Sequence, residues 1–212
     1  VPPPTFCWLC RAQRRLAYRN ERGLFKRTSS LSGEETFSMY PADAPFPIYT
    51  RDEWYSDAWD PMDYGRDYDF SRSFFEQFLE LTHEVPRTAR SAWNLENSDY
   101  VNNASDLKNC YLLFNANSDE DCLYGNGIDQ SNWCVDCSHV NQSELCYEGF
   151  WLNKCNKVFF SDACEECHDV WFSKNLRGCS NCIGCMNLRN KNYCIWNKQY
   201  TKEEYEQQKE KL

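Results

Sequence analysis

A chain of 212 residues is long enough for one or two domains, and it combines fourteen cysteines and a 16% aromatic fraction with a polar mean hydropathy of −0.78. No apolar run approaches the roughly 20 residues needed to cross a bilayer, and no signal peptide precedes the first motif. We therefore expect no membrane partner and a cytoplasmic location, which also suits many thiols. The net charge of −9 argues against a nucleic-acid surface spread over the whole molecule.

The charge is divided unevenly along the chain. Residues 1–27 carry seven basic side chains and one acidic one, a net charge of +6, so the remaining residues sum to −15. The basic segment either binds an acidic partner or pairs with the acidic stretch between Glu34 and Asp69, and the sequence leaves both interpretations open. Its basic residues are Arg11, Arg14, Arg15, Arg19, Arg22, Lys26 and Arg27.

Composition and periodicity divide the chain into four predicted segments. They are an Arg-rich and then acidic, aromatic module over 1–70, a helix and linker over 71–98, a β-solenoid over 99–198 and a capping helix over 199–212. In the second segment, apolar residues from Phe74 to Leu79 recur at helical spacing. Ser73 and Glu76 fit a capping box at its start, and Pro86 ends it. We expect the phenylalanine stripe of this helix to pack against a core.

A twelve-residue repeat fills the third segment. Steps of twelve from Cys110 meet only cysteine or valine, and the column that starts at Ala116 is entirely apolar. Two further columns hold mostly small or sulfur-bearing residues, so inward positions recur every third residue. Such a period is typical of a solenoid, in which each coil buries its face only against the next. Asp119 and Lys191 break the fourth column, which we interpret as capping of the two ends.

These patterns define the predicted fold class. We expect a mainly β protein: a cysteine-lined β-solenoid with an irregular amino-terminal module and one or two short helices. Thr201 and Glu204 form a second capping box, which predicts a short polar helix from Lys202 that closes the far end of the coil.

The cysteines of the repeat need no ligand to explain their spacing. All twelve that follow residue 100 fall in the same one-in-three phase, so CxxC pairs arise from the coil itself. We favour free thiols that stack as small apolar side chains. Disulfides across the coil are one alternative. A metal or cluster site at Cys179, Cys182 and Cys185, with Cys194 nearby, is the other.

The twelve-residue, cysteine-lined coil resembles that of insect antifreeze β-helices in architecture only. Those proteins bind ice through a flat Thr-x-Thr ladder, whereas this chain places large apolar residues beside its first cysteine column. Such a stripe needs a cover: we favour the aromatic residues of the amino-terminal half, and a partner or second copy of the chain is the alternative. This apolar ladder is Tyr111, Leu123, Val135, Tyr147, Phe159, Trp171, Ile183 and Ile195.

A CxxC pair, Cys7 and Cys10, precedes the Arg-rich segment and is half of a structural zinc site, which takes four ligands. Nearly the whole chain resembles a family of zinc-ribbon proteins with a cysteine-rich repeat, found mainly in small-genome bacteria. The strings that carry this resemblance are residues 1–7, 14–22, 54–60, 64–67, 74–78, 179–189 and 196–205. The resemblance implies that Cys7 and Cys10 complete a zinc ribbon with an upstream CxxC, which would lie before Val1. We expect no other cofactor.

A second four-cysteine ribbon is usual in that family, and this sequence departs from it. The matching positions are Ser29, Ser32, Thr50 and Glu53, and none is a thiol. We therefore expect this ribbon to be metal-free. We expect its loops to be held by packing among Tyr40, Phe46, Tyr49 and Trp54.

The leading functional hypothesis is a non-enzymatic binding or scaffold protein. In it, the solenoid presents the basic, zinc-ribbon-like head to nucleic acid or to an acidic protein surface. The seven basic residues would contact phosphate, and Trp8 or Tyr18 would stack on a base. The third-ranked hypothesis is a structural oligomer assembled through the apolar ladder.

The runner-up hypothesis is an enzyme with an acid/base site at the junction of head and solenoid. Its signal in the sequence is weak, because the chain contains no phosphate loop, nucleophile elbow or HExxH motif. The carboxylates more simply anchor turns or pair with arginines. The candidate residues are Asp57, Asp60, Asp67, Asp69 and His83.

Overall fold

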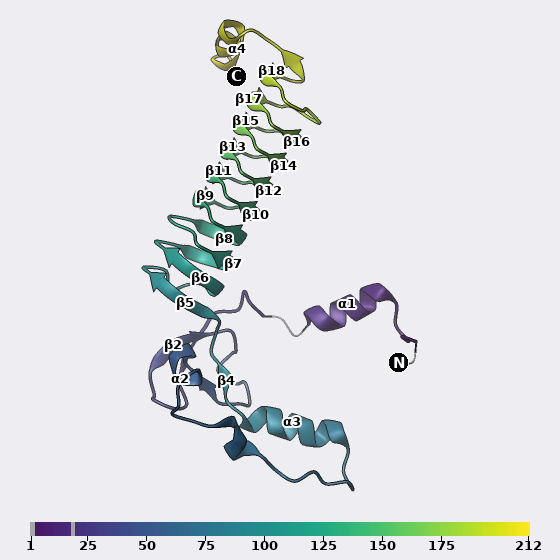
Figure 1. Ribbon diagram of the computed structural model, residues 1–212, viewed down its shortest axis with the longest axis vertical. Helices are drawn as coiled ribbons and strands as arrows, with labels where there is room; N and C mark the ends of the chain where they lie inside the picture. The colour runs from purple at the N-terminus through teal and green to yellow at the C-terminus, as the bar shows by residue number, and fades with distance from the viewer. Residues whose placement is uncertain (1–2, 18–19) are drawn as a thin grey trace. The chain divides into compact units, whose positions relative to one another are not determined.

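The computed structural model describes residues 3–17 and 20–212 and divides into two compact units, residues 1–91 and 92–212. The first unit holds short elements (Figure 1). These are α1 (Trp8–Leu16), β1 (Phe25–Thr28), β2 (Glu35–Ser38), β3 (Ile48–Tyr49), α2 (Arg51–Trp54), the 3-10 helix η1 (Pro61–Tyr64), α3 (Phe74–Glu84) and β4 (Arg87–Thr88).

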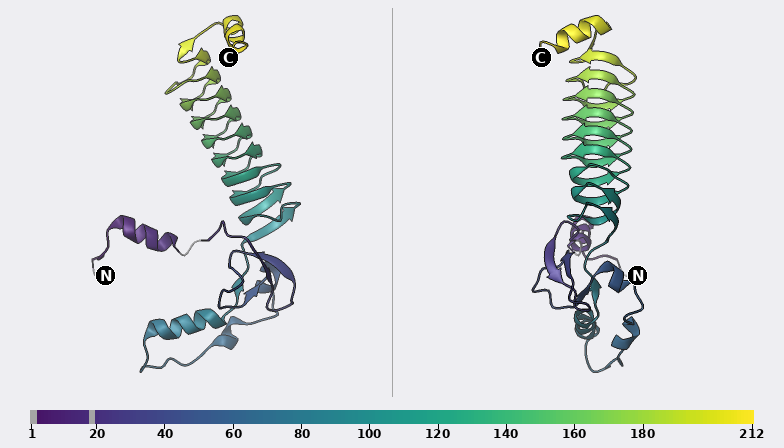
Figure 2. Two further views of the ribbon diagram at one scale, coloured as in Figure 1. Left: turned by 180° about the vertical axis from the view of Figure 1, so that it is seen from behind. Right: turned by 90° about the vertical axis from the view of Figure 1, so that its left-hand side faces the viewer.

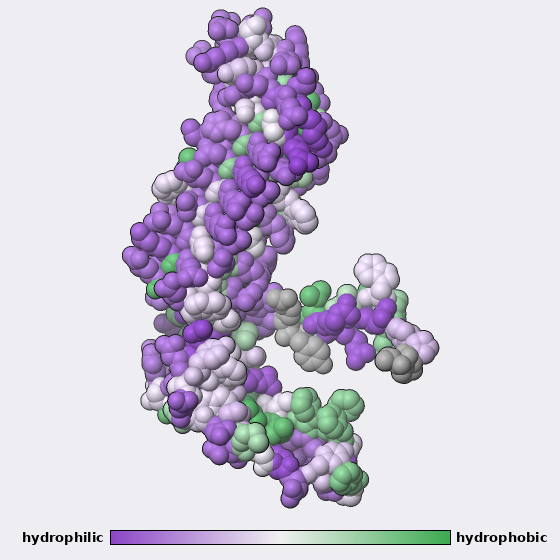
Figure 3. All heavy atoms as spheres, in the orientation of Figure 1, coloured by the Kyte–Doolittle hydropathy of each residue, from purple (hydrophilic) through white to green (hydrophobic). Residues whose placement is uncertain are grey.

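The first unit contains two small β-sheets. Strands β1 and β2 form an antiparallel hairpin, and β3 pairs in parallel with β4. The predicted helix is α3, and the Ser73 Oγ accepts a hydrogen bond from the Glu76 N–H at 3.3 Å, as expected of an N-cap. The expectation that its phenylalanine stripe packs against a core is wrong. Phe74, Phe75 and Phe78 are 56%, 79% and 50% exposed, and Figure 3 shows apolar side chains gathered over α3.

The second unit is the predicted β-solenoid, with about nine coils (Figure 2). Fourteen parallel strands and one antiparallel closing strand form its continuous sheet. They are β5 (Ala92–Glu96), β6 (Asn102–Lys108), β7 (Tyr111–Asn117), β8 (Leu123–Asp129), β9 (Asn132–Val135), β10 (Ser138–Asn141), β11 (Glu144–Tyr147), β12 (Phe150–Asn153), β13 (Asn156–Phe159), β14 (Asp162–Glu165), β15 (His168–Trp171), β16 (Lys174–Arg177), β17 (Ser180–Ile183), β18 (Asn192–Ile195) and β19 (Lys198–Gln199).

The register of the sheet confirms the twelve-residue period. Cys134 pairs with Cys146, and Cys182 pairs with Cys194, each one coil apart. Beyond β8 the strands form two parallel ladders, with β10, β12, β14 and β16 in one and β9, β11, β13, β15, β17 and β18 in the other. All twelve cysteines of the repeat are buried and free, and they form one core with the apolar columns.

The coil starts earlier in the chain than the sequence predicts. Strand β5 is already a rung, with Ala92 paired to Ala104 and Leu95 paired to Leu107. The repeat is harder to recognise there because its inward residues carry no sulfur. As a consequence, Asp119 is not an end residue, and our interpretation of it as a cap is wrong: it lies inside the coil and is 2% exposed.

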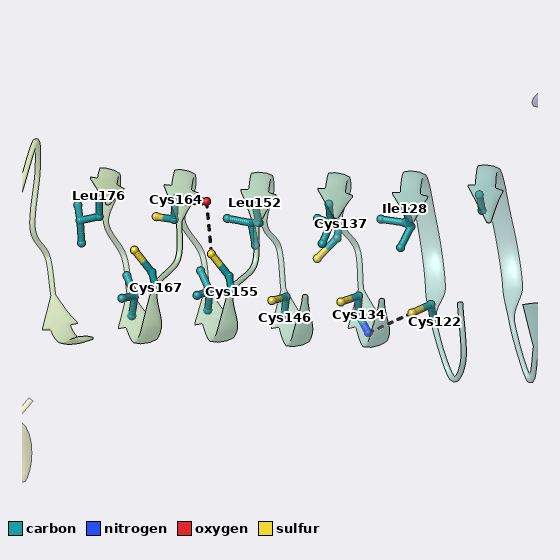
Figure 4. Packing of buried hydrophobic residues seen from close by; sticks show 14 of the residues in the cluster. Cys122, Ile128, Cys134, Cys137, Cys146, Leu152, Cys155, Cys164, Cys167 and Leu176 are labelled. Carbon is teal, nitrogen blue, oxygen red and sulfur yellow. Dashed lines mark hydrogen bonds between the residues drawn. The ribbon is translucent and has the colours of Figure 1, made fainter. Parts of the chain in front are cut away.

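The interior cysteines and serines satisfy backbone groups. The Ser131 Oγ donates to the Asp129 carbonyl at 2.9 Å and accepts from the Ser143 N–H at 3.1 Å, one coil later. The Cys122 Sγ makes the same two contacts at longer distances. It donates to the Glu120 carbonyl at 3.4 Å, and it accepts from the Cys134 N–H at 3.4 Å (Figure 4). Since an unpaired buried N–H is costly, small side chains with a lone pair suit this interior better than purely apolar ones.

Helix α4 (Lys202–Lys209) closes the carboxy-terminal end of the solenoid, as the capping box predicts. The side chains of Thr201 and Glu204 each accept from the other's backbone N–H. Tyr205 is fully buried against Tyr193, with ring centroids 5.6 Å apart. A salt bridge of 2.8 Å between Lys209 and Asp169 fastens the helix to β15. Among residues 3–17 and 20–212, no helix has the length and apolar character needed to span a membrane.

Candidate functional site

Cys7 and Cys10 lie at the start of α1. Cys7 is the N-cap residue, its Sγ accepts from the Cys10 N–H at 3.4 Å, and the two Sγ atoms are 3.4 Å apart. Hydrogen bonds from the backbone and then the thiol of Cys10 lower the pKa of Cys7. Both side chains are exposed, whereas every other cysteine is buried. The pair can supply two thiolate ligands to zinc, half of the usual tetrahedral set.

Within the described part of the chain, no group of three or more His, Cys, Asp or Glu side chains could hold a metal ion. Cys179, Cys182 and Cys185 are buried in the coil and do not form such a group. Burial raises the pKa of the Cys110 thiol to about 11, so it stays neutral at ordinary pH. At Cys110 the interior thus favours a protonated thiol that packs as a small apolar side chain.

Three of the predicted basic residues share helix α1. Arg11, Arg14 and Arg15 lie in a helix without any acidic residue, and none of them forms an ion pair with another described residue. The Arg14 guanidinium lies 5.3 Å from the ring centroid of Phe6. No residue of α1 is buried, and Trp8 is 68% exposed. The helix therefore presents positive charge beside an exposed indole.

The other predicted basic residues have different surroundings. Arg22 and Lys26 are exposed, and Lys26 lies on the β1 strand. The Arg27 side chain donates to the Pro41 carbonyl at 3.0 Å, which ties it to the fold. Arg19 and Tyr18 lie outside the described residues.

The residues that stand in place of the second ribbon's cysteines are joined by the carboxylate of Glu53. The Glu53 Oε2 accepts from the Ser29 Oγ at 2.5 Å and from the Thr50 N–H at 2.7 Å. Burial alone would raise the pKa of Glu53, but hydrogen bonds from Ser29, Ser32 and Thr50 outweigh it and lower the pKa to about 2. A hydrogen-bonded carboxylate thus joins the two loops. The sequence offered a signal for it, since Thr50-x-x-Glu53 is a capping box.

Aromatic packing supports the same region, as expected, but through an additional residue. Tyr40 and Phe46 form an edge-on pair with centroids 4.9 Å apart. Tyr49 and Trp54 each contact Trp59, at 5.4 and 6.1 Å. The cluster is therefore built around Trp59, which the sequence analysis left out.

The apolar ladder occupies one side of the solenoid. Most of its members are half-buried by their neighbours along the column, as in the stacked rings of Phe159 and Trp171 at 4.3 Å. Tyr111 is 38% exposed, and Ile195 is buried. The residue after each ladder member belongs to a second column that the sequence analysis missed. Its exposed aromatic members are Tyr100, Tyr124, Phe160, Phe172 and Trp196.

The acid/base candidates do not form a common site. The Asp60 Oδ1 accepts from the Met62 N–H at 2.8 Å, and the Asp69 Oδ1 accepts from the Ser71 N–H at 2.8 Å, so both anchor turns. Asp67 borders a depression of about 150 Å³, which the apolar side of α3 mostly lines. Asp57 is exposed, and His83 lies in the last turn of α3.

The fold places the protein in a class: it is a cysteine-rich β-solenoid. In comparisons with known proteins, no family model matches the chain, and no curated protein matches it. The resemblance to zinc-ribbon proteins therefore stays a prediction, and any function must be argued from the surfaces described above.

Proposed function

We propose that the protein is a non-enzymatic binding or scaffold protein whose basic amino-terminal segment binds nucleic acid or an acidic protein surface. The observation that carries the proposal is helix α1, where three exposed arginines stand without an acidic neighbour in the helix. Charged side chains that pack against their own protein are normally paired with an opposite charge. A cluster of arginines without such partners therefore favours binding of an external anion.

Trp8 supports the nucleic-acid version of the proposal. Its exposed indole lies in the same helix as the arginines, which is the combination that proteins use to stack a base and neutralise its phosphate. Each neutralised phosphate releases a counterion, so the affinity should fall steeply with salt. The solenoid, rigid through its continuous sheet, then serves as a scaffold in the same chain.

Binding of a fluorescent single-stranded oligonucleotide and of an acidic peptide to the full chain tests the proposal. We expect Arg14→Gln with Arg15→Gln to weaken binding at low salt at least about tenfold. The control, Lys154→Gln with Lys157→Gln, changes the same charge at two exposed solenoid positions and should leave the affinity alone. Trp8→Ala should weaken oligonucleotide binding only. Equal effects of the two double variants, or no binding to either probe at low salt, would refute the proposal.

Assembly through the apolar ladder is the second candidate. Two aromatic residues of the neighbouring column favour it, because Phe172 is 61% exposed and stacks on Phe160 at 4.9 Å. An exposed apolar stripe of this kind typically marks an interface. Light scattering of the full chain should then report a dimer that Phe172→Asp dissociates. Phe150→Asp, at another exposed position of the coil, should leave the dimer intact.

We also propose that Cys7 and Cys10 bind zinc as a cofactor of the basic amino-terminal segment. The two exposed thiols are of the ligand type that zinc prefers, and the two further ligands of a tetrahedral site would come from outside the described residues. Elemental analysis of the purified chain, with a Cys7→Ser variant as control, measures it directly.

A further inference from the structure

An open depression of about 390 Å³ lies on the first coils of the solenoid, away from the apolar ladder. These coils differ from the later ones: β6, β7 and β8 are seven residues long, whereas each strand from β9 to β18 has four (Figure 1). The depression is large enough for a small ligand. Its lining includes one aromatic ring and several polar side chains, among them Trp93, Asn103, Asn115, Asn117 and Asp129.

One side of the depression is a column of residues that follows the coil axis. Trp93 pairs with Ser105 one coil later, and Ser105 pairs with Asn117. Asn117 pairs in turn with Asp129. Neighbouring strands lie about 4.8 Å apart, so the column repeats at that step. Trp93 is 43% exposed, and an accessible indole therefore stands in line with evenly spaced polar side chains.

Hydrogen bonds between the coils hold these polar side chains in place. The Asn103 Nδ2 donates to the Asn115 Oδ1 at 2.6 Å, and the Asn117 Nδ2 donates to the Asp129 Oδ1 at 3.0 Å. A carboxamide has two N–H donors and two acceptor lone pairs, so one such bond uses only part of its capacity. Because the amides are already ordered, a ligand that bonds to them loses little further side-chain entropy.

The chemistry of the lining selects a neutral, hydroxyl-rich ligand. Among the described residues that line the depression, Asp129 is the only charged one, so no basic group is present to bind a phosphate or a carboxylate. One carboxylate also falls short of the six or more oxygen ligands that a calcium ion takes. Carboxamides both donate to and accept from hydroxyl groups. An indole presents a large apolar face, which packs against the C–H face of a sugar ring.

The step between coils distinguishes an oligosaccharide from a peptide. Bond lengths near 1.5 Å give a six-membered sugar ring with its linking oxygen a length of about 5 Å. This length is close to the coil step of about 4.8 Å. An extended peptide advances by about 6.7 Å for each pair of residues that point the same way, so it loses register with the column within two coils.

We propose that the first coils bind a neutral, extended oligosaccharide along the coil axis. One sugar ring stacks on Trp93, and the following rings hydrogen-bond to Asn115 and Asn117. The neutral face does not continue along the whole solenoid. Further along the same column, Glu165 and Arg177 pair with each other one coil apart and form a salt bridge at 3.2 Å.

Calorimetry with the full chain tests the proposal, with cellohexaose and β-1,4-mannohexaose as neutral, extended probes. We expect saturable binding of at least one of them. Trp93→Ala should weaken this binding at least about tenfold, and Asn117→Ala several-fold. The matched controls are Trp196→Ala and Asn175→Ala, which remove an exposed indole and an exposed ladder amide at later coils and should leave the affinity unchanged.

Nuclear magnetic resonance of the wild type gives a readout that needs no replacement. The indole signal of Trp93 and the carboxamide signals of Asn115 and Asn117 should move on addition of the probe, while those of Trp196 and Asn175 stay in place. Movement confined to the later coils would overturn the proposal.

Three further results would also overturn it: no binding of either probe, equal losses in the variants and their controls, or binding of anionic hexagalacturonate as tight as that of the neutral probes. A neutral Gly-Thr repeat peptide that binds as tightly as the sugars would assign the groove to peptides instead. None of these results depends on whether the basic segment binds a nucleic acid.

Discussion

The N–H of Cys134 donates a hydrogen bond to the Sγ of Cys122, which lies twelve residues earlier and one full coil away, at 3.4 Å (Figure 4). Elsewhere in the coil a serine oxygen is the acceptor of the same kind of hydrogen bond: the Cys110 N–H donates to the Ser98 Oγ at 2.9 Å. The inward side chain of one coil thus accepts the inward N–H of the next. This relationship explains why cysteine and serine alternate with aliphatic residues in the core.

Replacing Cys122 should separate packing from this hydrogen bond. Cys122→Ala removes the acceptor and leaves a cavity, and we expect a loss of about 1–3 kcal/mol in the free energy of unfolding. Cys122→Ser keeps an acceptor of the kind that Ser131 provides, so it should be less damaging. Urea unfolding under reducing conditions measures both. Equal losses for alanine and serine would show that the sulfur acts only by its volume.

A buried carboxyl should make the solenoid less stable at alkaline pH. The Asp119 Oδ1 accepts from the Ser131 N–H at 2.9 Å, while its Oδ2 is buried without a partner among the described residues. Burial raises the pKa of Asp119 to about 7. The native state then binds the proton more tightly than the unfolded chain, so stability is fully present below about pH 4 and falls as the pH rises to 7.

The matched variant is Asp119→Asn, which keeps the accepting oxygen and cannot ionise. Relative to it, the wild type should lose roughly 2–4 kcal/mol between pH 4.5 and pH 8. Asp121→Asn, at a neighbouring outward position, is the control and should not alter the pH profile. A wild-type profile that runs parallel to that of Asp119→Asn would contradict the buried, protonated carboxyl.

The hydroxyl of Tyr205 is a second unsatisfied group. The ring is fully buried under α4, and the hydroxyl is buried with no hydrogen-bond partner among the described residues. We expect Tyr205→Phe to be neutral or slightly stabilising, because it removes a desolvated polar atom and keeps the ring. Tyr205→Ala should cost roughly 3–5 kcal/mol and make the thiols at the capped end more reactive. Thermal unfolding and thiol labelling follow the two effects, and a marked loss for phenylalanine would reveal a hidden partner of the hydroxyl.

The solenoid could be predicted because its cause is local and repeated. Every third residue must point inward, so Cys110 and its successors carry the period in the sequence itself. Every third residue of the coil has a positive φ, as at Asn115 and Asn187, and the sequence analysis did not use the asparagines at such positions. Asparagine tolerates this conformation better than most residues, but Trp133 and Phe160 adopt it too, which shows that coil stacking overrides local preference.

The amino-terminal unit was less predictable because its contacts join residues that no period relates. The Ser29 and Glu53 side chains are hydrogen-bonded although they lie 24 positions apart in the sequence, and only the family resemblance predicts them as neighbours. That resemblance also could not say what would replace the metal. The exposure of Phe75 on α3 was unforeseen for the same reason: helical spacing defines a face but not whether anything covers it.

The carboxylate of Glu53 should hold the amino-terminal unit together in the way that a metal ion would. Its hydrogen bonds to Ser29 and Thr50 are charge-assisted, so Glu53→Ala should destabilise this unit by roughly 2–4 kcal/mol. Asp52→Ala removes the same charge from the same helix at a side chain that is 98% exposed, and it should cost no more than about 0.5–1 kcal/mol. Hydrogen exchange of the Ser29–Glu34 loop reports on this unit separately from the solenoid.

The pH dependence of the same contact has a defined sign. Because the pKa of Glu53 is lowered to about 2 in the folded chain, the carboxylate's contribution is present above the unfolded value of about 4.3 and is lost as the pH falls toward 2. The wild-type loop should therefore lose protection between pH 4.5 and pH 2, and Glu53→Ala, already without the contact, should show little change over this range. If both chains lost protection in parallel, the loops would be held by the Trp59 aromatic cluster rather than by the carboxylate.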